Sequence, residues 1–371
     1  MKRNIKLFVI LAVIAFGGAM LLRGHVAEAQ TQAPGQPTQV LTAGQSTHYK
    51  NIKVLNDMPA DQLGRVMNLW AASLGVDCDF CHVTSDFSKD DKKPKATARE
   101  MVKMVMNINK ENFNSRPRVT CNSCHNGHME PRPVPDLSAV PMPEERPLQP
   151  VTKPTADQIF DKYAEAVGGK DKFDKITSIV ETGTRTERDG KQVEQETRYY
   201  QPGKYALKTV YPQVTLTELY DGTMARKFAR QAIELRPDEQ EQIRREAAMF
   251  SPASLRAAYT RVDFLGVDKI DGRLVNIMSG ITAANQREQL GFDAETGLLV
   301  RRRMTSQTMF GAFPLQIDYS DYKVFNGIKL PTTIKYSMPN LMWTRRITGV
   351  KINAPVEATV FQAPAAAGET E

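Results

Sequence analysis

The sequence contains two C-x-x-C-H motifs, and together they use every cysteine of the chain. The first runs from Cys78 to His82 and the second from Cys121 to His125. Two thiols at this spacing can add to the two vinyl groups of one haem, and the histidine that follows then offers its imidazole to the iron. The sequence therefore predicts two covalently bound haem c groups, with these thiols and axial histidines: Cys78, Cys81, Cys121, Cys124, His82 and His125.

Two other uses of paired cysteines compete with haem attachment. A thioredoxin-like redox pair requires a βαβ context and normally a single motif, and no such context is visible here. A four-cysteine zinc site accepts paired C-x-x-C knuckles at about this separation, but it does not need a histidine directly after each pair. The two histidines therefore favour haem.

A methionine is expected as the sixth iron ligand at each haem, because methionine raises the reduction potential relative to a second histidine. Upstream of the first motif, Asp57 is predicted to cap a helix with Pro59 in its first turn, and Gly75 to end it. One face of this helix is apolar and includes Met67. A helix and a short turn can fold Met67 back over the first haem. The residues of this face are Leu63, Val66, Met67 and Trp70.

A second helix is predicted from 97 to 112, and Arg116-Pro117 marks its end. Met101 is the preferred ligand of the second haem, and Met104, on the same face, is its rival. His128 is a weaker alternative. Methionine on an apolar stripe is usually core filling, but two irons that each need a sixth ligand raise the probability of ligation.

Residues from about 55 to 135 resemble one half of the cytochrome c subunit of the photosynthetic reaction centre. The stretches that carry the resemblance are 67–70 leading to 73–82, and 99–109 leading to 119–127. The resemblance implies electron transfer, and it implies Met67 and Met101 as the sixth ligands. That subunit carries four haems, whereas this chain has two motifs and a large additional C-terminal region. Donation to a photosynthetic reaction centre is therefore one possibility among several.

The N-terminus reads as an export signal. Lys2, Arg3 and Lys6 precede an uncharged apolar run from 7 to 22, and Ala27-Glu28-Ala29 fits a small-x-small cleavage site. A signal peptide over 1–29, cleaved after Ala29, is expected, with an uncleaved membrane anchor as the alternative. The formal net charge of +7 falls to about +4 without this segment, which is too weak to predict nucleic-acid binding.

The composition of the other segments predicts the domain and linker boundaries of the chain. Residues 30–47 are predicted to be a flexible tether, 48–135 a small all-α diheme cytochrome domain, 136–154 a proline-rich linker, and 366–371 a disordered tail. The fold class expected is α + β multidomain, with residues 155–365 forming an antiparallel β half-barrel with one to three helices. The start of the proline-rich segment can equally be a strap along the haem domain.

The half-barrel prediction depends on its turns and on its alternating strands. Turn signals recur at Asp189-Gly190, Pro202-Gly203, Asp221-Gly222, Asp271-Gly272, 295–297 and Asn326-Gly327. Helices are predicted after a capping box at 155–158, at 237–250 and at 253–259. The stretches 319–331 and 353–355 resemble, weakly, the half-barrels of periplasmic lipoprotein carriers. Such a fold could hold a lipid, or it could be a scaffold that docks the cytochrome to a partner.

Catalysis is poorly supported in this C-terminal region, which has no cysteine and no histidine. Arg301, Arg302 and Arg303 are predicted to be a solvated strand edge. The function predicted is an exported diheme c-type cytochrome of the periplasm, or of the outer face of the inner membrane. It would transfer single electrons between redox partner proteins such as a reaction centre or a respiratory complex, more as a carrier than as an enzyme. A haem peroxidase and a redox-sensing lipid- or lipoprotein-binding module are the alternatives.

Overall fold

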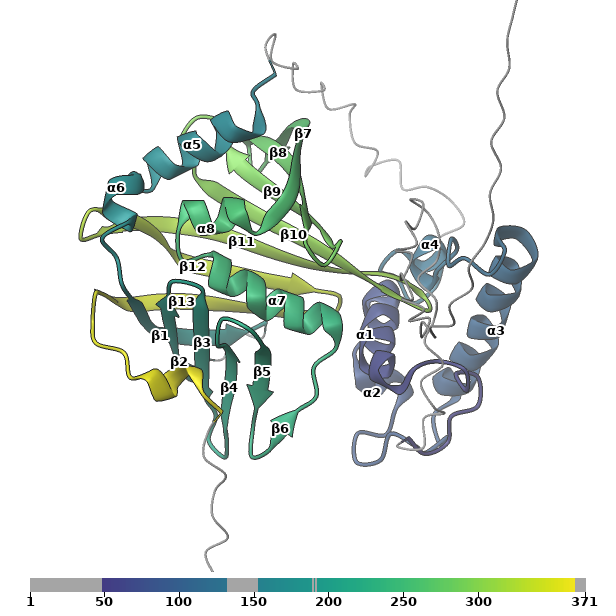
Figure 1. Cartoon of the computed structure of the whole chain (residues 1–371). Coiled ribbons are helices and arrows are strands. Elements are labelled where there is room, and N and C mark those ends of the chain that lie inside the picture. Colours follow the sequence, from purple (N-terminus) through teal and green to yellow (C-terminus); the bar gives the residue numbers. More distant parts are fainter. Residues whose placement is uncertain (1–48, 132–152, 189, 191, 364–371) are drawn as a thin grey trace, which may run out of the picture. The chain divides into compact units, whose positions relative to one another are not determined.

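The largest element of the structure is one antiparallel sheet, shown in the computed structural model of Figure 1. The structure describes residues 49–131, 153–188, 190 and 192–363. The predicted signal, the tether, most of the proline-rich linker and the tail lie outside these residues. Among the described residues, no helix is long and apolar enough to cross a membrane.

The strands follow the order β6-β5-β4-β3-β2-β1-β13-β12-β11-β10-β9-β8-β7, so that two meanders are joined where β1 pairs with β13. The strand bounds are β1 Ile179–Glu187, β2 Gln192–Gln201, β3 Lys204–Val210, β4 Thr215–Tyr220, β5 Ala225–Phe228, β6 Ala232–Ile233, β7 Tyr259–Ile270, β8 Arg273–Thr282, β9 Arg287–Asp293, β10 Leu299–Thr308, β11 Gly311–Phe325, β12 Ile328–Met338 and β13 Leu341–Ile352. The predicted antiparallel sheet is confirmed.

Tight turns at the predicted positions connect successive strands of the two meanders. Asp271-Gly272 and Asn326-Gly327 both have positive φ at both residues, which is the geometry that two-residue hairpin loops require. Gly203, Gly222 and Gly297 also have positive φ, at three further predicted turns. Asp189 of the remaining turn lies outside the described residues.

Helices precede and interrupt the sheet. Between Tyr49 and Pro131 the described regular structure is helical, apart from one bridge between Val83 and Asp86. The helix bounds are η1 Ala60–Gln62, α1 Leu63–Leu74, α2 Cys78–Cys81, α3 Lys93–Phe113, α4 Cys121–His125, α5 Ala156–Ala166, α6 Lys170–Phe173, α7 Pro237–Ala248, α8 Pro252–Ala257 and η3 Ala358–Phe361. The described residues from Tyr49 onward belong to one compact unit.

Two predicted helix starts were wrong. Asp57 caps nothing, because a short 3-10 turn begins after Pro59 and α1 starts only at Leu63. Helix α3 begins at Lys93, before the predicted start, because a proline fits the first turn of a helix. The predicted end of α1 is confirmed, since Gly75 is left-handed with φ of 67°.

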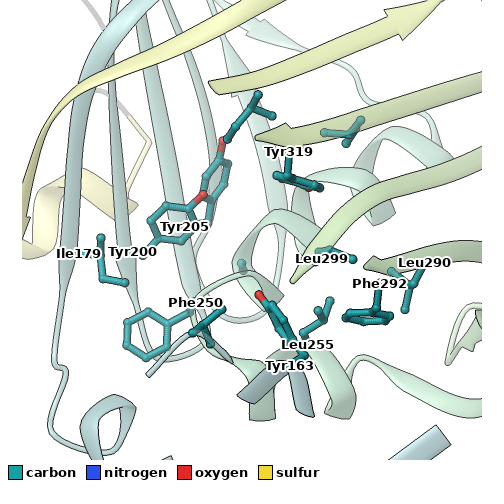
Figure 2. Packing of buried hydrophobic residues seen from close by; sticks show 14 of the residues in the cluster. Tyr163, Ile179, Tyr200, Tyr205, Phe250, Leu255, Leu290, Phe292, Leu299 and Tyr319 are labelled. Carbon is teal, nitrogen blue, oxygen red and sulfur yellow. The ribbon is translucent and has the colours of Figure 1, made fainter. Parts of the chain in front are cut away.

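The main core lies between the sheet and helices α5, α7 and α8. Figure 2 shows Tyr200 and Tyr205 of the first meander near Phe250, and Phe292, Leu290 and Leu299 of the second near Leu255 and Tyr163. The capping box at the start of α5 is confirmed, since Gln158 N–H donates to Thr155 Oγ1. Burial of these side chains removes a large apolar area from water and fixes the helices on one face of the sheet.

The prediction that Arg301 to Arg303 form a solvated edge was wrong for Arg302. Strand β10 lies inside the sheet between β9 and β11, so alternate side chains face the core. Arg302 is 0% exposed, and its Nε lies 2.7 Å from Glu288 Oε1. The charge is tolerated because a carboxylate and the Tyr319 hydroxyl share its hydrogen bonds.

Candidate haem site

Each C-x-x-C pair occupies a single helical turn. Helix α2 begins at Cys78 and α4 begins at Cys121, so the two thiols of each pair are three residues apart on a helix. Side chains at that spacing lie on the same face. None of the four cysteines forms a disulfide. The structure therefore presents each pair as two adjacent sulfur atoms, which suits attachment to one planar group.

The two motif histidines share one hydrogen-bond arrangement. His82 Nδ1 lies 3.0 Å from the carbonyl oxygen of Phe87, and His125 Nδ1 lies 3.0 Å from the carbonyl oxygen of His128. Because a carbonyl only accepts, Nδ1 must donate, and a neutral ring then has its lone pair on Nε2. Both imidazoles are thus oriented with Nε2 free to bind a metal, in the manner that outer hydrogen bonds orient metal ligands.

The cysteine environments do not suit the other two uses. Burial raises the pKa of Cys121 to about 11, and burial also raises the pKa of Cys81. Reactive redox cysteines need the opposite shift, toward the thiolate. Across the described parts of the chain, no three His, Cys, Asp or Glu side chains gather in a way that could hold a metal ion. The two pairs therefore do not converge on one zinc site.

Buried valines anchor the helices that carry the candidate methionines. Val66 of α1 and Val102 of α3 belong to one apolar cluster, and they are 0% and 2% exposed. Met67 directly follows Val66, and Met101 directly precedes Val102. Successive residues of an α-helix are about 100° apart around its axis, so each methionine lies about 100° from its neighbouring valine. Met67 packs at the margin of the cluster, whereas Met101 and Met104 are exposed. Exposed methionines on α3 are available to a group bound beside that helix.

The indole of Trp70 also bears on whether the residues present suit a bound haem. Its Nε1 is buried and has no hydrogen-bond partner among the described residues. Buried donors are nearly always satisfied, and an unsatisfied one calls for an explanation, of which a group outside the polypeptide is one. With paired thiols and oriented imidazoles nearby in the sequence, the residues present fit a haem at each motif.

The segments that flank the two motifs are in direct contact. The amide of Gly127, just after the second motif, donates to the carbonyl oxygen of Ser73 at 2.8 Å. A Cβ on Gly75, just before the first motif, would lie 2.2 Å from the carbonyl oxygen of Gly127. The contact thus requires glycine at position 75, and it brings the ends of α1 and α4 together.

Comparison with known proteins finds relatives of the segment that contains the two motifs. Residues 21–158 match the family described as the photosynthetic reaction centre cytochrome C subunit. The haem-motif part of the chain resembles that family. The resemblance read from the motifs is therefore confirmed, over a stretch that contains both C-x-x-C-H sequences.

Individual relatives match over the same limited length. The reaction centre cytochrome c subunits of Roseobacter denitrificans and Thermochromatium tepidum are each 31% identical, over 23% and 26% of this chain and 26% of each relative. Cytochrome c-554 of Chloroflexus aurantiacus is 33% identical over 20% of both chains. This chain spans about a quarter or less of the length of these relatives.

Solved structures align with a little over half of the chain at low sequence identity. A LolA superfamily protein from Nitrosomonas europaea aligns with 57% of this chain and 99% of its own, at a TM-score of 0.42 and 12% identity. A lipoprotein-sorting protein domain from Vibrio parahaemolyticus aligns with 55% of this chain and 95% of its own, at 0.38 and 10%.

Sequence reasoning identified the thiols and histidines but missed the backbone groups that orient them. The carbonyl of Phe87 has no signature in the sequence, because any residue can supply it. Gly75 was read only as a helix end, although a glycine on each side of the motifs is a signal for close backbone approach. Phe310, which packs against Trp70, was also missed.

Proposed function

We propose that the chain is an exported diheme c-type cytochrome that transfers single electrons. The observation that supports this most directly is the repeated pair of thiols followed by a histidine whose Nδ1 donates to a carbonyl. Cys78 and Cys81 would hold one haem and Cys121 and Cys124 the other. His82 and Met67 would hold the iron of the first haem, and His125 and Met101 the iron of the second, with each histidine offering its Nε2.

When bound, haem iron supplies one-electron oxidation and reduction. The protein's part is to fix the axial ligands and their surroundings, since these set the potential. The carbonyls of Phe87 and His128 hold the imidazoles in one tautomer, and the Val66 and Val102 anchors hold the two methionine-bearing helices. The Gly127–Ser73 hydrogen bond joins the segments beside the two motifs, which supports electron exchange between the two haems.

The partners proposed are redox proteins on the outer side of the membrane, such as a reaction centre or a respiratory complex. A carrier needs no substrate pocket, and two methionine ligands would close both irons to substrate. The peroxidase alternative requires an open distal position. Rapid peroxide turnover by the reduced wild-type protein would favour that alternative over a carrier.

The haem content of the exported protein tests the proposal. Mass spectrometry and the pyridine haemochrome spectrum are expected to show two haems per chain. The double variants Cys78→Ala/Cys81→Ala and Cys121→Ala/Cys124→Ala should each retain one haem. His128→Ala serves as a matched control, because only its backbone carbonyl is used, and it should retain two. A purified protein with zinc and no haem would overturn the proposal.

For the half-barrel, a scaffold role is better supported than lipid transport. Glu246 of α7 pairs with Arg302 at 3.3 Å, and Arg245 Nη1 lies 3.4 Å from Glu288, so buried charges tie α7 to the sheet. An acyl chain on this face would have to displace α7 and leave those charges unpaired, which is costly. Native mass spectrometry after mild purification should show no acyl ligand; a stoichiometric lipid would favour the carrier alternative.

A further inference from the structure

The hairpin between β10 and β11 ends in an apolar turn. Thr308 pairs with Gly311, so Met309 and Phe310 form a two-residue loop. Such loops favour Asn-Gly or Asp-Gly, as at Asp271-Gly272 and Asn326-Gly327 of the same sheet. A methionine and a phenylalanine offer no turn advantage and are poorly suited to water. Phe310 is nevertheless only 5% exposed, so other residues cover the tip.

The cover comes from the helices of the haem motifs. The Phe310 ring meets the Trp70 ring edge-on, with centroids 5.1 Å apart and an interplanar angle of 80°. Phe310 belongs to the same buried cluster as Val66 of α1 and Val102 of α3, and Met67 packs against that cluster. The hairpin tip therefore completes the core that holds both methionine-bearing helices.

The same tip also contacts the second motif. A Cβ on Gly311 would lie 2.9 Å from Thr120 Cγ2, and Gly311 has φ of 123°, where L side chains are rare. Thr120 is the N-cap of α4 and forms its capping box with Ser123. The hairpin thus touches the residue that starts the helix of Cys121.

Polar contacts fix the hairpin in this position. The Met309 amide donates to Gln62 Oε1 at 2.9 Å, at the start of α1. Arg65 of α1 donates to Ser306 Oγ at 2.9 Å and forms an ion pair with Asp238 of α7. Arg65 is also stacked 5.6 Å from the centre of the Phe313 ring. One arginine therefore links α1 to both the hairpin and α7.

We infer that the tip of the β10–β11 hairpin, residues 308–311, is a positioning element of the haem site, with Phe310 setting the helix of Met67 and Gly311 setting the start of α4. This inference depends on the proposed function, and it gives the half-barrel a definite task. The sheet holds the helices that carry the iron ligands, and so contributes to the potentials of both haems.

The experiment compares Phe310→Ala and Gly311→Ala in the holoprotein. Single-haem cysteine variants first assign each potential to one motif. Phe310→Ala should weaken the methionine–iron absorption and shift the potential of the haem at His82. It should also make amide hydrogen exchange in α1 faster by roughly tenfold or more, as a cavity loosens the cluster. Gly311→Ala should act mainly on the haem at His125, through Thr120.

Two controls separate positioning from general destabilisation. Leu341→Ala alters an exposed residue at the β12–β13 turn of the same sheet and should change neither haem. Phe292→Ala opens a cavity in the main core and should lower the stability of the sheet without a spectral shift. Faster exchange in α1 with unchanged spectra and potentials would overturn the inference, because Phe310 would then be structural only. A wild-type chain without haem would overturn the proposed function first, and that result is distinguishable from unchanged potentials in a loaded protein.

Discussion

The carbonyl oxygen of Ser73 accepts a hydrogen bond from the amide of Gly127 at 2.8 Å, which joins the segments beside the two C-x-x-C-H motifs. Ser73 is in the last turn of α1 and is buried, and Gly127 follows α4. Neither residue is part of a motif, yet their contact fixes how the motifs face each other. The spacing between two haems would therefore be set by backbone geometry, not by the motif side chains.

This contact predicts a large effect of Gly75→Ala. Position 75 is left-handed, which costs a non-glycine residue about 1–2 kcal/mol, and a Cβ there would lie 2.2 Å from Gly127 O. The variant should attach fewer haems per chain and unfold at lower temperature. Gly64→Ala is the matched control, because a Cβ there meets nothing within 4 Å. Gly64 lies in the first turn of α1, so alanine there should stabilise by at most about 0.5 kcal/mol, the low end of the mid-helix value. Equal haem content in both variants would contradict the role given to Gly75.

Replacement of the candidate methionines should change one haem at a time. Met67→His and Met101→His should each lower the potential of one haem, by a fraction of the ~0.8 V range that axial ligands span. Spectroelectrochemistry would show one wave moving and the other unchanged. Met104→Ala, one turn along the exposed face of α3, should leave both potentials in place. If Met104→Ala moved the second wave and Met101→His did not, Met104 would be the ligand.

A pH dependence is expected from Asp90. Hydrogen bonds from Arg99, Lys53 and Asn51 hold the pKa of this carboxyl well below its usual value of 3.8. Since the folded pKa is depressed, the stabilisation is fully present above the unfolded pKa. It is lost as the pH falls below about 3.8 toward the folded pKa.

Asp90→Asn should therefore lower the melting temperature at neutral pH and converge with the wild type in strong acid. Asp86→Asn is a useful comparison. The pKa of Asp86 is also lowered, but chiefly through Ser88 two residues away, so it ties no distant segments together. Its substitution should have the smaller effect on melting. A constant difference between Asp90→Asn and the wild type at every pH would show that ionisation of Asp90 is not involved.

How far the sequence predicted this molecule depends on the range of each interaction. The thiols, the histidines and the hairpin turns at Asp271 and Asn326 are local signals, because the chemistry or the φ angle is encoded within five residues. The end of α1 at Gly75 was predicted for the same reason. The start of α3 was missed because a proline at position 94 reads as a break as easily as a first turn.

Contacts between residues far apart in the sequence had no comparable local sequence signal. Arg302 was read as exposed because three consecutive arginines suggest water, and only the register of β9, β10 and β11 reveals that the middle one faces Glu288. Phe310 was missed because its partner Trp70 lies far away in the sequence. The two methionines, the number of haems and the domain boundaries remain predictions, since none is decided by the fold alone.

The buried pair of Arg302 and Glu288 gives the sharpest stability prediction. Arg302→Met removes the guanidinium 2.7 Å from Glu288, a carboxylate that is 0% exposed, and leaves Arg245 at 3.4 Å as the remaining cation, so the change should cost about 3 kcal/mol, the lower end for breaking a buried pair. Arg303→Met, the next residue on β10, alters an exposed side chain and should stay within about 0.5 kcal/mol of the wild type. Urea unfolding followed by far-ultraviolet circular dichroism measures both.

The double variant Arg302→Met/Glu288→Gln then separates the pair from its surroundings. Because the second change removes the unpaired charge, the double variant should be more stable than Arg302→Met alone, by about 0.5–3 kcal/mol. Glu246 of α7 and the hydroxyl of Tyr259 would keep part of the cost, since each also faces this pair. Strict additivity of the two substitutions would mean that Arg302 is satisfied by other groups. The Arg302–Glu288 ion pair, which joins β10 to β9, would then contribute little to the stability of the sheet.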